Sequence, residues 1–338
     1  MRHTKIQNIS KNISKIAFGG ATVYSFDRYS YYIRALDQYA AGGGNLIDTG
    51  LCYGGWTPNI PVAIEVKVPE NLAGTWSDHG YSPSELMVGQ WVKSQNRDDI
   101  VISTKGAHPI FGSMTKSRVR PEFIADDIAC SLRNLDVEHI DIYFLHRDDW
   151  DQTYPVSKII DELNRHVDKG EIGALGASNW TGRRIEEANE YAAAHGLRGF
   201  SVNQILFSLA EISIEQSGDP TIICMNENEY DYARKLGLTV MAYTSQARGF
   251  FSKYAHDPKA AEKSPFASEE NIKRLTRVAE MSREKGLTPA EISIAYLTSL
   301  DVDTVPIVGF SLLEQLAEST SAGNITLTKA EVDYLAGR

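Results

Sequence analysis

Short runs of apolar residues alternate with longer stretches of helical periodicity along most of the chain. The apolar runs are rich in Ile, Val and Ala and end in polar residues, which is typical of buried parallel strands. The longer stretches repeat apolar residues every three or four positions, which predicts amphipathic helices. The expected strands span residues 16–20, 45–47, 99–104, 140–145, 172–177, 200–203, 238–242 and 304–308. The expected helices span residues 28–41, 83–93, 121–134, 155–169, 181–195, 226–236, 268–285, 289–299, 312–321 and 328–335.

The regular alternation of strands and helices favours parallel βαβ units. Eight such units in a chain of 338 residues fit a (β/α)8 TIM barrel, and we expect residues 1–338 to form one domain. An open doubly wound sheet is the rival fold, but no expected strand is followed by the G-x-G-x-x-G pattern. Ahead of the barrel, apolar runs at residues 6–9 and 13–17 predict an N-terminal β-hairpin.

A segment rich in Pro, Gly and Trp interrupts the alternation after the second expected strand. It covers residues 54–82 and contains Trp56 and Trp76. Long insertions without periodicity in compact domains are usually lids or binding loops. We therefore expect an inserted loop that acts as a substrate lid, with packing of the loop on itself or oligomer contacts as the alternatives.

Composition excludes several classes of partner. The formal net charge is −10 and no Lys/Arg cluster stands out, which argues against binding to nucleic acid or to an anionic membrane surface. No apolar run is long enough to span a bilayer and no signal core is present, so we expect no membrane segment. The three cysteines are odd in number and lack metal-ligand spacing, which predicts no metal site and a cytoplasmic location.

Polar side chains directly follow three of the expected strands. Asp48 follows the second strand, Lys105 the third and His146 the fourth, while Tyr53 lies five residues after Asp48. Because the active sites of (β/α)8 barrels lie at the carboxyl ends of the strands, we expect these four side chains to converge. A buried acid is costly unless it is paired, so Lys105 is the expected partner of Asp48.

These residues belong to a longer series of motifs. The motifs are Asp48-Thr-Gly-Leu-Cys-Tyr-Gly54, Ser84-Glu85 with Gly89, Thr104-Lys105, Ser131-Leu132 with Asp141, Leu145-His146, Gly176-Ala-Ser-Asn179, Gln204, Ala242-Tyr243 and Arg248-Gly249. In this order and spacing they resemble the aldo-keto reductase superfamily, from about residue 18 to residue 335. The resemblance implies a (β/α)8 barrel that binds a nicotinamide cofactor without a Rossmann domain and interconverts a small carbonyl compound and its alcohol. It also implies that Asp48, Tyr53, Lys105 and His146 form the catalytic tetrad.

The four residue types suit carbonyl reduction for a physical reason. Hydride transfer to a carbonyl builds negative charge on oxygen, so a proton donor has to lie there. Tyr53 is the expected general acid, and a nearby ammonium at Lys105 should lower its pKa from about 10. Asp48 would keep Lys105 charged, and His146 would orient the substrate oxygen.

The resemblance further implies the cofactor site. Ser178, Asn179 and Gln204 match the group that binds the carboxamide, and Tyr243 matches the aromatic residue on which the nicotinamide stacks. The family positions for the rest of the cofactor are Gly20, Asp48, Thr244, Ser245, Gln246, Arg248, Gly309, Ser311 and Gln315. Many NADPH-using relatives carry a cation just after the glycine, whereas Phe310 stands there in this chain. NADP(H) is the expected cofactor, with NAD(H) as the alternative.

The substrate pocket is expected to be aromatic with polar neighbours, which suits a sugar or sugar-derived carbonyl compound. Its expected lining is Tyr53, Trp56, Trp76, His108, His146, Trp180 and Phe207. Two other functions remain open on the same barrel: an aldolase that uses Lys105 as a Schiff-base nucleophile, and a non-catalytic protein that binds nicotinamide as a sensor or regulatory subunit. The pairing of Lys105 with Asp48 argues against the first, and the complete tetrad against the second.

Overall fold

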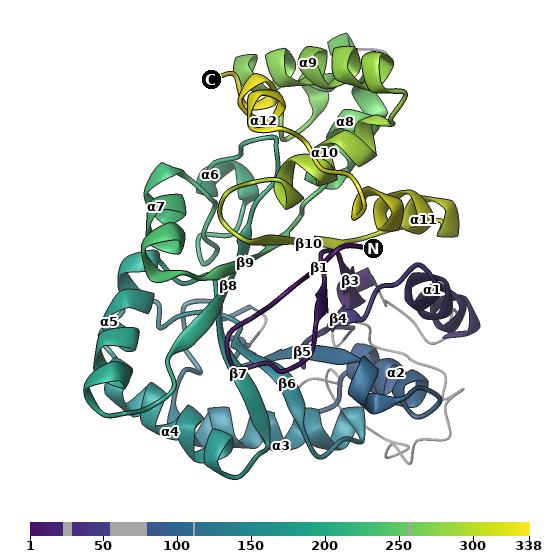
Figure 1. Cartoon of the computed structure of the whole chain (residues 1–338). Coiled ribbons are helices and arrows are strands. Elements are labelled where there is room, and N and C mark those ends of the chain that lie inside the picture. Colours follow the sequence, from purple (N-terminus) through teal and green to yellow (C-terminus); the bar gives the residue numbers. More distant parts are fainter. Residues whose placement is uncertain (23–28, 55–79, 111, 256–257) are drawn as a thin grey trace.

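The computed structural model describes residues 1–22, 29–54, 80–110, 112–255 and 258–338. Eight parallel strands close into a barrel in the order β10-β3-β4-β5-β6-β7-β8-β9, as the sequence predicts. Figure 1 shows the helices arranged around these central strands. The strands are β3 (Ala17–Gly19), β4 (Leu46–Asp48), β5 (Val101–Gly106), β6 (Ile140–Leu145), β7 (Ile172–Ser178), β8 (Phe200–Leu206), β9 (Thr239–Tyr243) and β10 (Thr304–Val308).

The helices between the strands cover the outside of the barrel, while α9 and α12 lie farther out at one edge (Figure 1). Among the described residues, none of the helices combines the length and the apolar composition needed to cross a bilayer. The α-helices are α1 (Tyr29–Ala41), α2 (Pro83–Val92), α3 (Pro121–Leu135), α4 (Val156–Asp168), α5 (Gly182–Ala194), α6 (Ile214–Ser217), α7 (Glu227–Leu236), α8 (Phe250–Tyr254), α9 (Glu269–Lys285), α10 (Pro289–Thr298), α11 (Leu313–Ala322) and α12 (Lys329–Ala336).

The N-terminal hairpin pairs β1 (His3–Thr4) with β2 (Ile13–Ser14) in antiparallel register. The hairpin itself is confirmed, but its first strand precedes the predicted run at residues 6–9. Ile6 is buried against the interior layer of the barrel, so it is apolar because it packs there and not because it belongs to a paired strand. The hairpin therefore places the apolar residues of its connecting segment against the barrel.

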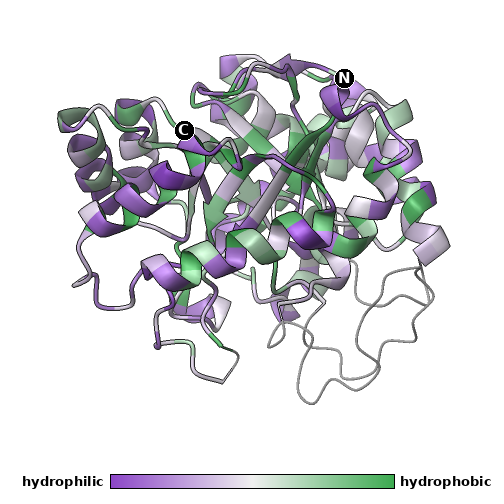
Figure 2. Ribbon diagram, turned by 90° about the horizontal axis from the view of Figure 1, so that it is seen from below, coloured by the Kyte–Doolittle hydropathy of each residue, from purple (hydrophilic) through white to green (hydrophobic). Residues whose placement is uncertain are grey.

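Alternation along the strands separates two apolar layers. Val101 and Ile142 belong to a cluster in the barrel interior, whereas Ile102 and Tyr143 belong to the larger cluster between strands and helices. Successive side chains of a strand point to opposite faces, so one strand supplies both layers. Figure 2 shows the hydrophobic positions concentrated along the central strands, with hydrophilic positions more frequent on the helices.

Candidate active site

The site residues continue the inward-facing series of their strands. Asp48 lies two positions after the interior residue Leu46, Lys105 two after Ser103, and His146 two after Phe144. A period of two therefore aims all three side chains into the barrel at the carboxyl end of the strands. Since β4, β5 and β6 are neighbours in the barrel, the three side chains converge as the sequence predicts.

Asp48 is only 2 % exposed, and its carboxylate accepts three hydrogen bonds. Oδ1 accepts from Ser103 Oγ at 2.8 Å and from Gln204 Nε2 at 2.9 Å, and Oδ2 accepts from Lys105 Nζ at 2.7 Å. A buried carboxylate is tolerated when its charge is paired and its lone pairs are occupied. This network fixes Lys105 and Gln204 relative to the end of β4.

Lys105 is fully buried and lies beside the ring of Tyr53. Its ammonium donates to Asp48 and to the carbonyl oxygen of Thr49 at 2.6 Å, and it lies 4.7 Å from the centroid of the Tyr53 ring. Burial lowers the pKa of Lys105 from its ordinary value of 10.5, whereas the ion pair with Asp48 opposes that shift. The structure thus places a cation next to the phenol.

The turn that carries Tyr53 is tied to the start of α2. Ser82, the N-cap of α2, donates from Oγ to the carbonyl oxygens of Gly50 at 2.9 Å and Tyr53 at 3.2 Å. Gly54 follows with φ +81°, and a Cβ atom there would lie 2.9 Å from Pro83. Only glycine combines this conformation with so close an approach. The helix cap and the glycine therefore set the position of Tyr53.

His146 lies between Tyr53 and two further side chains that face the same space. Its ring packs edge-on against Tyr53, with centroids 5.5 Å apart, and against His108 at 4.7 Å. Nδ1 lies 3.6 Å from Cys52 Sγ. Burial lowers the pKa of His146 well below its ordinary value of 6.5 and that of His108 to about 4. Both imidazoles are therefore neutral near pH 7.

A cavity of about 780 Å³ opens above these residues and is lined by residues from all eight barrel strands or the loops that follow them. Lys105 is fully buried and does not line the cavity, but it contacts Asp48 and Tyr53, which do. The predicted site residues that line the cavity are Asp48, Tyr53, His108, His146, Ser178, Asn179, Gln204, Tyr243, Thr244, Ser245, Gln246, Arg248, Gly309, Ser311 and Gln315.

Three predicted site residues lie away from this lining. Trp180 is fully buried between strands and helices and packs against Phe200, so it is not a pocket residue. Phe207 packs edge-on against Tyr230. A Cβ atom at Gly20 would lie 2.8 Å from the Asp48 carbonyl oxygen and from Ser84 Oγ, so its compactness serves backbone packing. Trp56, Trp76 and most of the predicted lid at 54–82 lie outside the described residues.

The edge of the barrel beyond β7 and β9 presents polar groups already held in place. Asn179 has φ +59° and Thr244 has φ +54°, a conformation uncommon outside glycine that clusters at functional sites. Tyr243 Oη donates to Asn179 Oδ1 at 2.7 Å, and Asn179 Nδ2 donates to Ser178 Oγ at 3.1 Å. Gln204 Nε2 donates to Asp48, so the Gln204 side chain connects this edge to the acid–lysine pair.

Several cavity residues were not predicted from the sequence as site residues. Cys52 and Arg147 adjoin Tyr53 and His146 in the chain, and their positions at strand ends were the available signal. Lys253 and Glu318 come from α8 and α11 and carry no motif. Arg147 donates to Asp219 at 3.2 Å and to the His146 carbonyl oxygen at 2.8 Å, so it connects the end of β6 to the segment that carries Asp219.

Comparison with known proteins gives the same family throughout. The model of the Aldo/keto reductase family matches residues 15–337. Aldo-keto reductase str7 of Strobilurus tenacellus is 28 % identical over 76 % of this chain and 74 % of its own. Norsolorinic acid reductase B of Aspergillus parasiticus is 28 % identical over 78 % and 70 %, and that of Dothistroma septosporum 27 % over 78 % and 67 %.

A solved structure has the same fold at low sequence identity. A thermostable aldo-keto reductase in complex with the inhibitor epalrestat superposes with a TM-score of 0.71 over 100 % of this chain and 99 % of its own, at 19 % identity. The barrel, the convergence of polar side chains at its carboxyl edge and the family match over nearly the whole sequence lead to one assignment. The chain belongs to the aldo/keto reductase family and is an oxidoreductase that acts on carbonyl compounds.

Proposed function

We propose that the protein reduces a carbonyl compound with NAD(P)H, with Tyr53 as the general acid. The observation that carries this proposal is the buried Lys105–Asp48 ion pair at 2.7 Å directly beside the Tyr53 ring. A cation next to a phenol favours loss of the phenolic proton. Tyr53 and His146 line the same cavity with their ring centroids 5.5 Å apart, which supports a role for both at one substrate oxygen.

The lining of the cavity fits a dinucleotide. Ser178, Asn179 and Gln204 offer donors and acceptors for an amide, and Tyr243 offers an aromatic ring beside them. Ser245, Arg248 and Lys253, after β9, offer hydroxyl and cationic groups that suit phosphates. When bound, a reduced nicotinamide supplies a hydride to the carbonyl carbon.

Residues of the chain protonate and orient the carbonyl oxygen of the substrate. Tyr53 donates its proton to the oxygen as negative charge builds there, and the Lys105 ammonium stabilises the phenolate that remains. Neutral His146 can donate a hydrogen bond to the same oxygen and orient it. Asp48 holds Lys105 in place through their 2.7 Å contact. In the reverse direction Tyr53 accepts the proton of the alcohol.

NADP(H) is the proposed cofactor because Arg248 and Lys253 both line the cavity and could pair with a 2′-phosphate. Glu318 on α11 supports the alternative, because a carboxylate near the ribose favours the 2′-hydroxyl of NAD(H). Titration of the protein with NADPH and NADH, followed by fluorescence, decides between them. A lower Kd for NADH would reverse the assignment.

For the substrate we propose a sugar or sugar-derived carbonyl compound. Arg147, His108 and His146 give the cavity floor several hydrogen-bonding groups beside aromatic rings, which suits a polyol. A panel of sugars, aromatic aldehydes and aliphatic aldehydes tests this proposal. Two relatives are named for norsolorinic acid, so that compound belongs in the panel as well. Turnover confined to aromatic or aliphatic aldehydes would contradict the sugar proposal.

Replacement of the phenolic hydroxyl tests the mechanism. Tyr53→Phe should lower kcat for carbonyl reduction by at least about 100-fold, the scale of a lost general acid, and leave cofactor Kd nearly unchanged. Stopped-flow oxidation of bound NADPH by the panel measures this. A wild-type protein that binds cofactor tightly but oxidises it with none of the carbonyl compounds would favour the sensor alternative.

The aldolase alternative has less support. A Schiff-base lysine has to be neutral and has to reach the substrate, whereas Lys105 is fully buried and paired with Asp48. Borohydride trapping with carbonyl substrates should leave the mass of the protein unchanged. We also propose a cytoplasmic location, because Cys52, Cys130 and Cys224 are all free thiols.

A further inference from the structure

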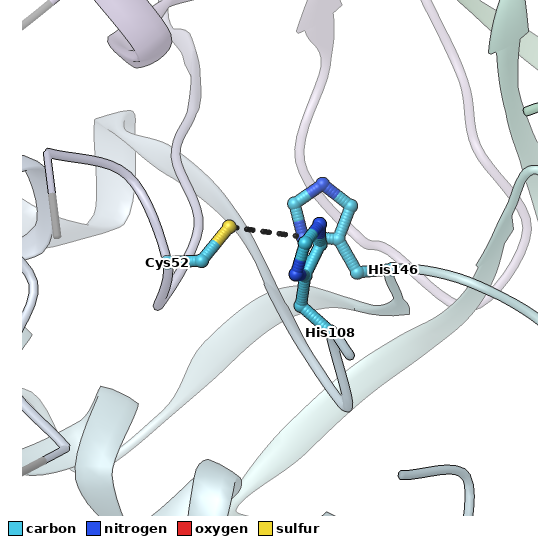
Figure 3. Close-up of side chains that lie close together, drawn as sticks. All are labelled: Cys52, His108 and His146. Carbon is cyan, nitrogen blue, oxygen red and sulfur yellow. Dashed lines mark hydrogen bonds between the residues drawn. The ribbon is translucent and has the colours of Figure 1, made fainter. Parts of the chain in front are cut away.

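Three side chains at the cavity floor form a cluster that the proposed reduction uses only in part. Cys52 follows β4, His108 follows β5 and His146 follows β6, so neighbouring strand ends bring them together. One ligand atom from each lies within 4.8 Å of the others. Figure 3 shows the thiol and the two imidazole rings facing the same space. Carbonyl reduction assigns a role to His146 but leaves the thiol without one.

We propose that Cys52, His108 and His146 bind a zinc-class divalent ion, which blocks the active site reversibly. Thiolate and imidazole are the ligands that Zn²⁺ prefers, at about 2.3 Å for sulfur and about 2.0–2.1 Å for nitrogen. Tetrahedral angles then place sulfur and nitrogen about 3.6 Å apart, and two nitrogens about 3.3 Å apart. The observed distance from Cys52 Sγ to His146 Nδ1 is 3.6 Å. The ligand atom of His108 lies within 4.8 Å of the other two.

The hydrogen bond of His108 prepares it to act as a ligand. Its Nδ1 lies 2.6 Å from the carbonyl oxygen of Pro109, which can only accept, so Nδ1 carries the proton. That tautomer puts the lone pair on Nε2. A ring N–H donated to a backbone carbonyl is the usual outer contact of a metal-binding histidine, because it fixes the orientation of the ring.

The ion has a path to the cluster and room for a fourth ligand. All three side chains line the cavity, so an ion can enter from the open side, and a water molecule can complete the tetrahedron. Two cations lie nearby, but Lys105 is paired with Asp48 and Arg147 with Asp219. Coordination by Cys52 releases the thiol proton to solvent, which reduces the added positive charge by one.

The consequence for activity depends on the proposed function. An ion held by Cys52, His108 and His146 lies in the cavity that Tyr53 also lines, so it should compete with the carbonyl compound. The groups proposed to hold the cofactor come from β7, β8 and β9 and from the segments that follow β9 and β10, whereas the cluster follows β4, β5 and β6. Zinc inhibition should therefore be competitive towards the carbonyl substrate and leave the Kd of the nicotinamide cofactor unchanged.

The decisive experiment is a Co²⁺ titration of the full chain, because tetrahedral Co²⁺ with a thiolate ligand gives a charge-transfer band in the near ultraviolet. Wild type should bind one ion with this band, and Zn²⁺ should displace it. Cys52→Ser should abolish the band. His108→Gln removes a ligand, so it should weaken binding by at least the roughly 10- to 100-fold that loss of a ligand's outer contact costs. Cys224→Ser is the matched control, because Cys52 and Cys224 are equally buried at 7 % exposure and Cys224 is not a cavity residue.

The readout needs no substrate turnover, so it is independent of the reductase proposal. Circular dichroism shows which variants are folded. A band that persists in Cys52→Ser, or binding without any thiolate band in wild type, would overturn the proposal. So would loss of the band in Cys224→Ser, since that result would place the ion at another thiol.

Discussion

The Asp48 carboxylate shows at the residue scale how a buried charge is held in this protein. It accepts from Ser103 and Lys105 on β5 and from Gln204 on β8, although only 2 % of the residue is exposed. Such a pair adds little to the free energy of unfolding, because the cost of desolvating both charges offsets their attraction, but leaving one charge buried without its partner is costly. Each of the two charges is therefore tolerated in the core only while the other is present.

Single and double replacement should expose that dependence. Lys105→Met leaves a buried carboxylate without its cation and should lower the free energy of unfolding by about 3–5 kcal/mol. Combining it with Asp48→Asn should restore part of that loss. Urea unfolding of both single variants and the double variant measures the coupling. Strictly additive losses would mean that the two side chains do not stabilise each other.

Neutral histidines at the cavity floor predict the pH dependence of the reaction. Burial depresses the pKa of His146 well below 6.5, so the ring stays neutral as pH falls through that value. The profile of kcat/KM should lack an acidic limb near pH 6.5, where an unshifted catalytic histidine would lower it about tenfold per pH unit. A limb at that pH that persists in His108→Gln would assign the titration to His146 and contradict this expectation.

At the scale of elements, α2 and α3 are joined to the barrel through a buried acid. Glu85 of α2 accepts from Thr104 of β5 at 2.5 Å and from Asn134 of α3 at 2.9 Å. Burial raises its pKa above the ordinary value of 4.5. The protonated form is favoured in the folded state, so its stabilising contribution is present below pH 4.5 and is lost as pH rises towards the folded pKa.

Glu85→Gln should remove the loss of stability that wild type shows as pH rises. The unfolding free energy of wild type should decline relative to the variant as pH rises above 4.5, because wild type then carries a desolvated charge and the amide does not. Urea unfolding at several pH values from about 5 to 8 measures the difference. Glu122→Gln, at an exposed position of α3, is the control and should follow wild type. Parallel curves for wild type and Glu85→Gln would contradict the assignment.

At the scale of the whole molecule, the cavity connects every strand of the barrel. Its lining runs from Gly19 at the end of β3 to Ile307 in β10, so a ligand held there contacts both sides of the β3–β10 seam. A ligand that binds only the folded state stabilises it in proportion to the logarithm of its concentration. Cofactor binding should therefore protect the closed barrel against unfolding.

That protection gives a measurement of cofactor preference. At a concentration of 100 Kd, the preferred cofactor should raise the free energy of unfolding by about 2.7 kcal/mol. NADPH should raise the thermal midpoint more than NADH at equal concentration, and Arg248→Met should reduce the NADPH shift. A protein stabilised by neither cofactor would contradict the proposed dinucleotide site.

The elements that could be predicted are those whose local pattern and tertiary position agree. The strands Ile140–Leu145 and Thr304–Val308 were predicted to the residue, because each is a short, mainly apolar run that begins after a polar residue and is followed by a histidine or a glycine. The short α6 and α8 were missed, because helices of four and five residues have too few turns for periodicity. That residues 1–338 form one domain, and that residues 54–82 act as a lid, stay predictions.

Some of the site residues could be predicted from the sequence and others could not. Asp48, Lys105 and His146 could be predicted because each follows a strand and barrels gather such residues at one edge. Trp180 follows a strand as well, yet it is fully buried between strands and helices. Ser178 lines the cavity and strict alternation would turn Trp180 to the same side, but Asn179 between them has φ +59°, which interrupts the alternation. Residue type and strand end alone did not indicate which face it occupies.

The sequence by itself determined the number and order of strands and the side chains at their ends, because these follow from alternation along a local stretch of chain. Only the tertiary structure decided which of those side chains meet. Cys52, His108 and His146 are far apart in the sequence and carry no shared spacing, and the side-by-side pairing of β4, β5 and β6 brings their ligand atoms within 4.8 Å of one another. Lateral packing of strands sets such distances, and no local pattern records them.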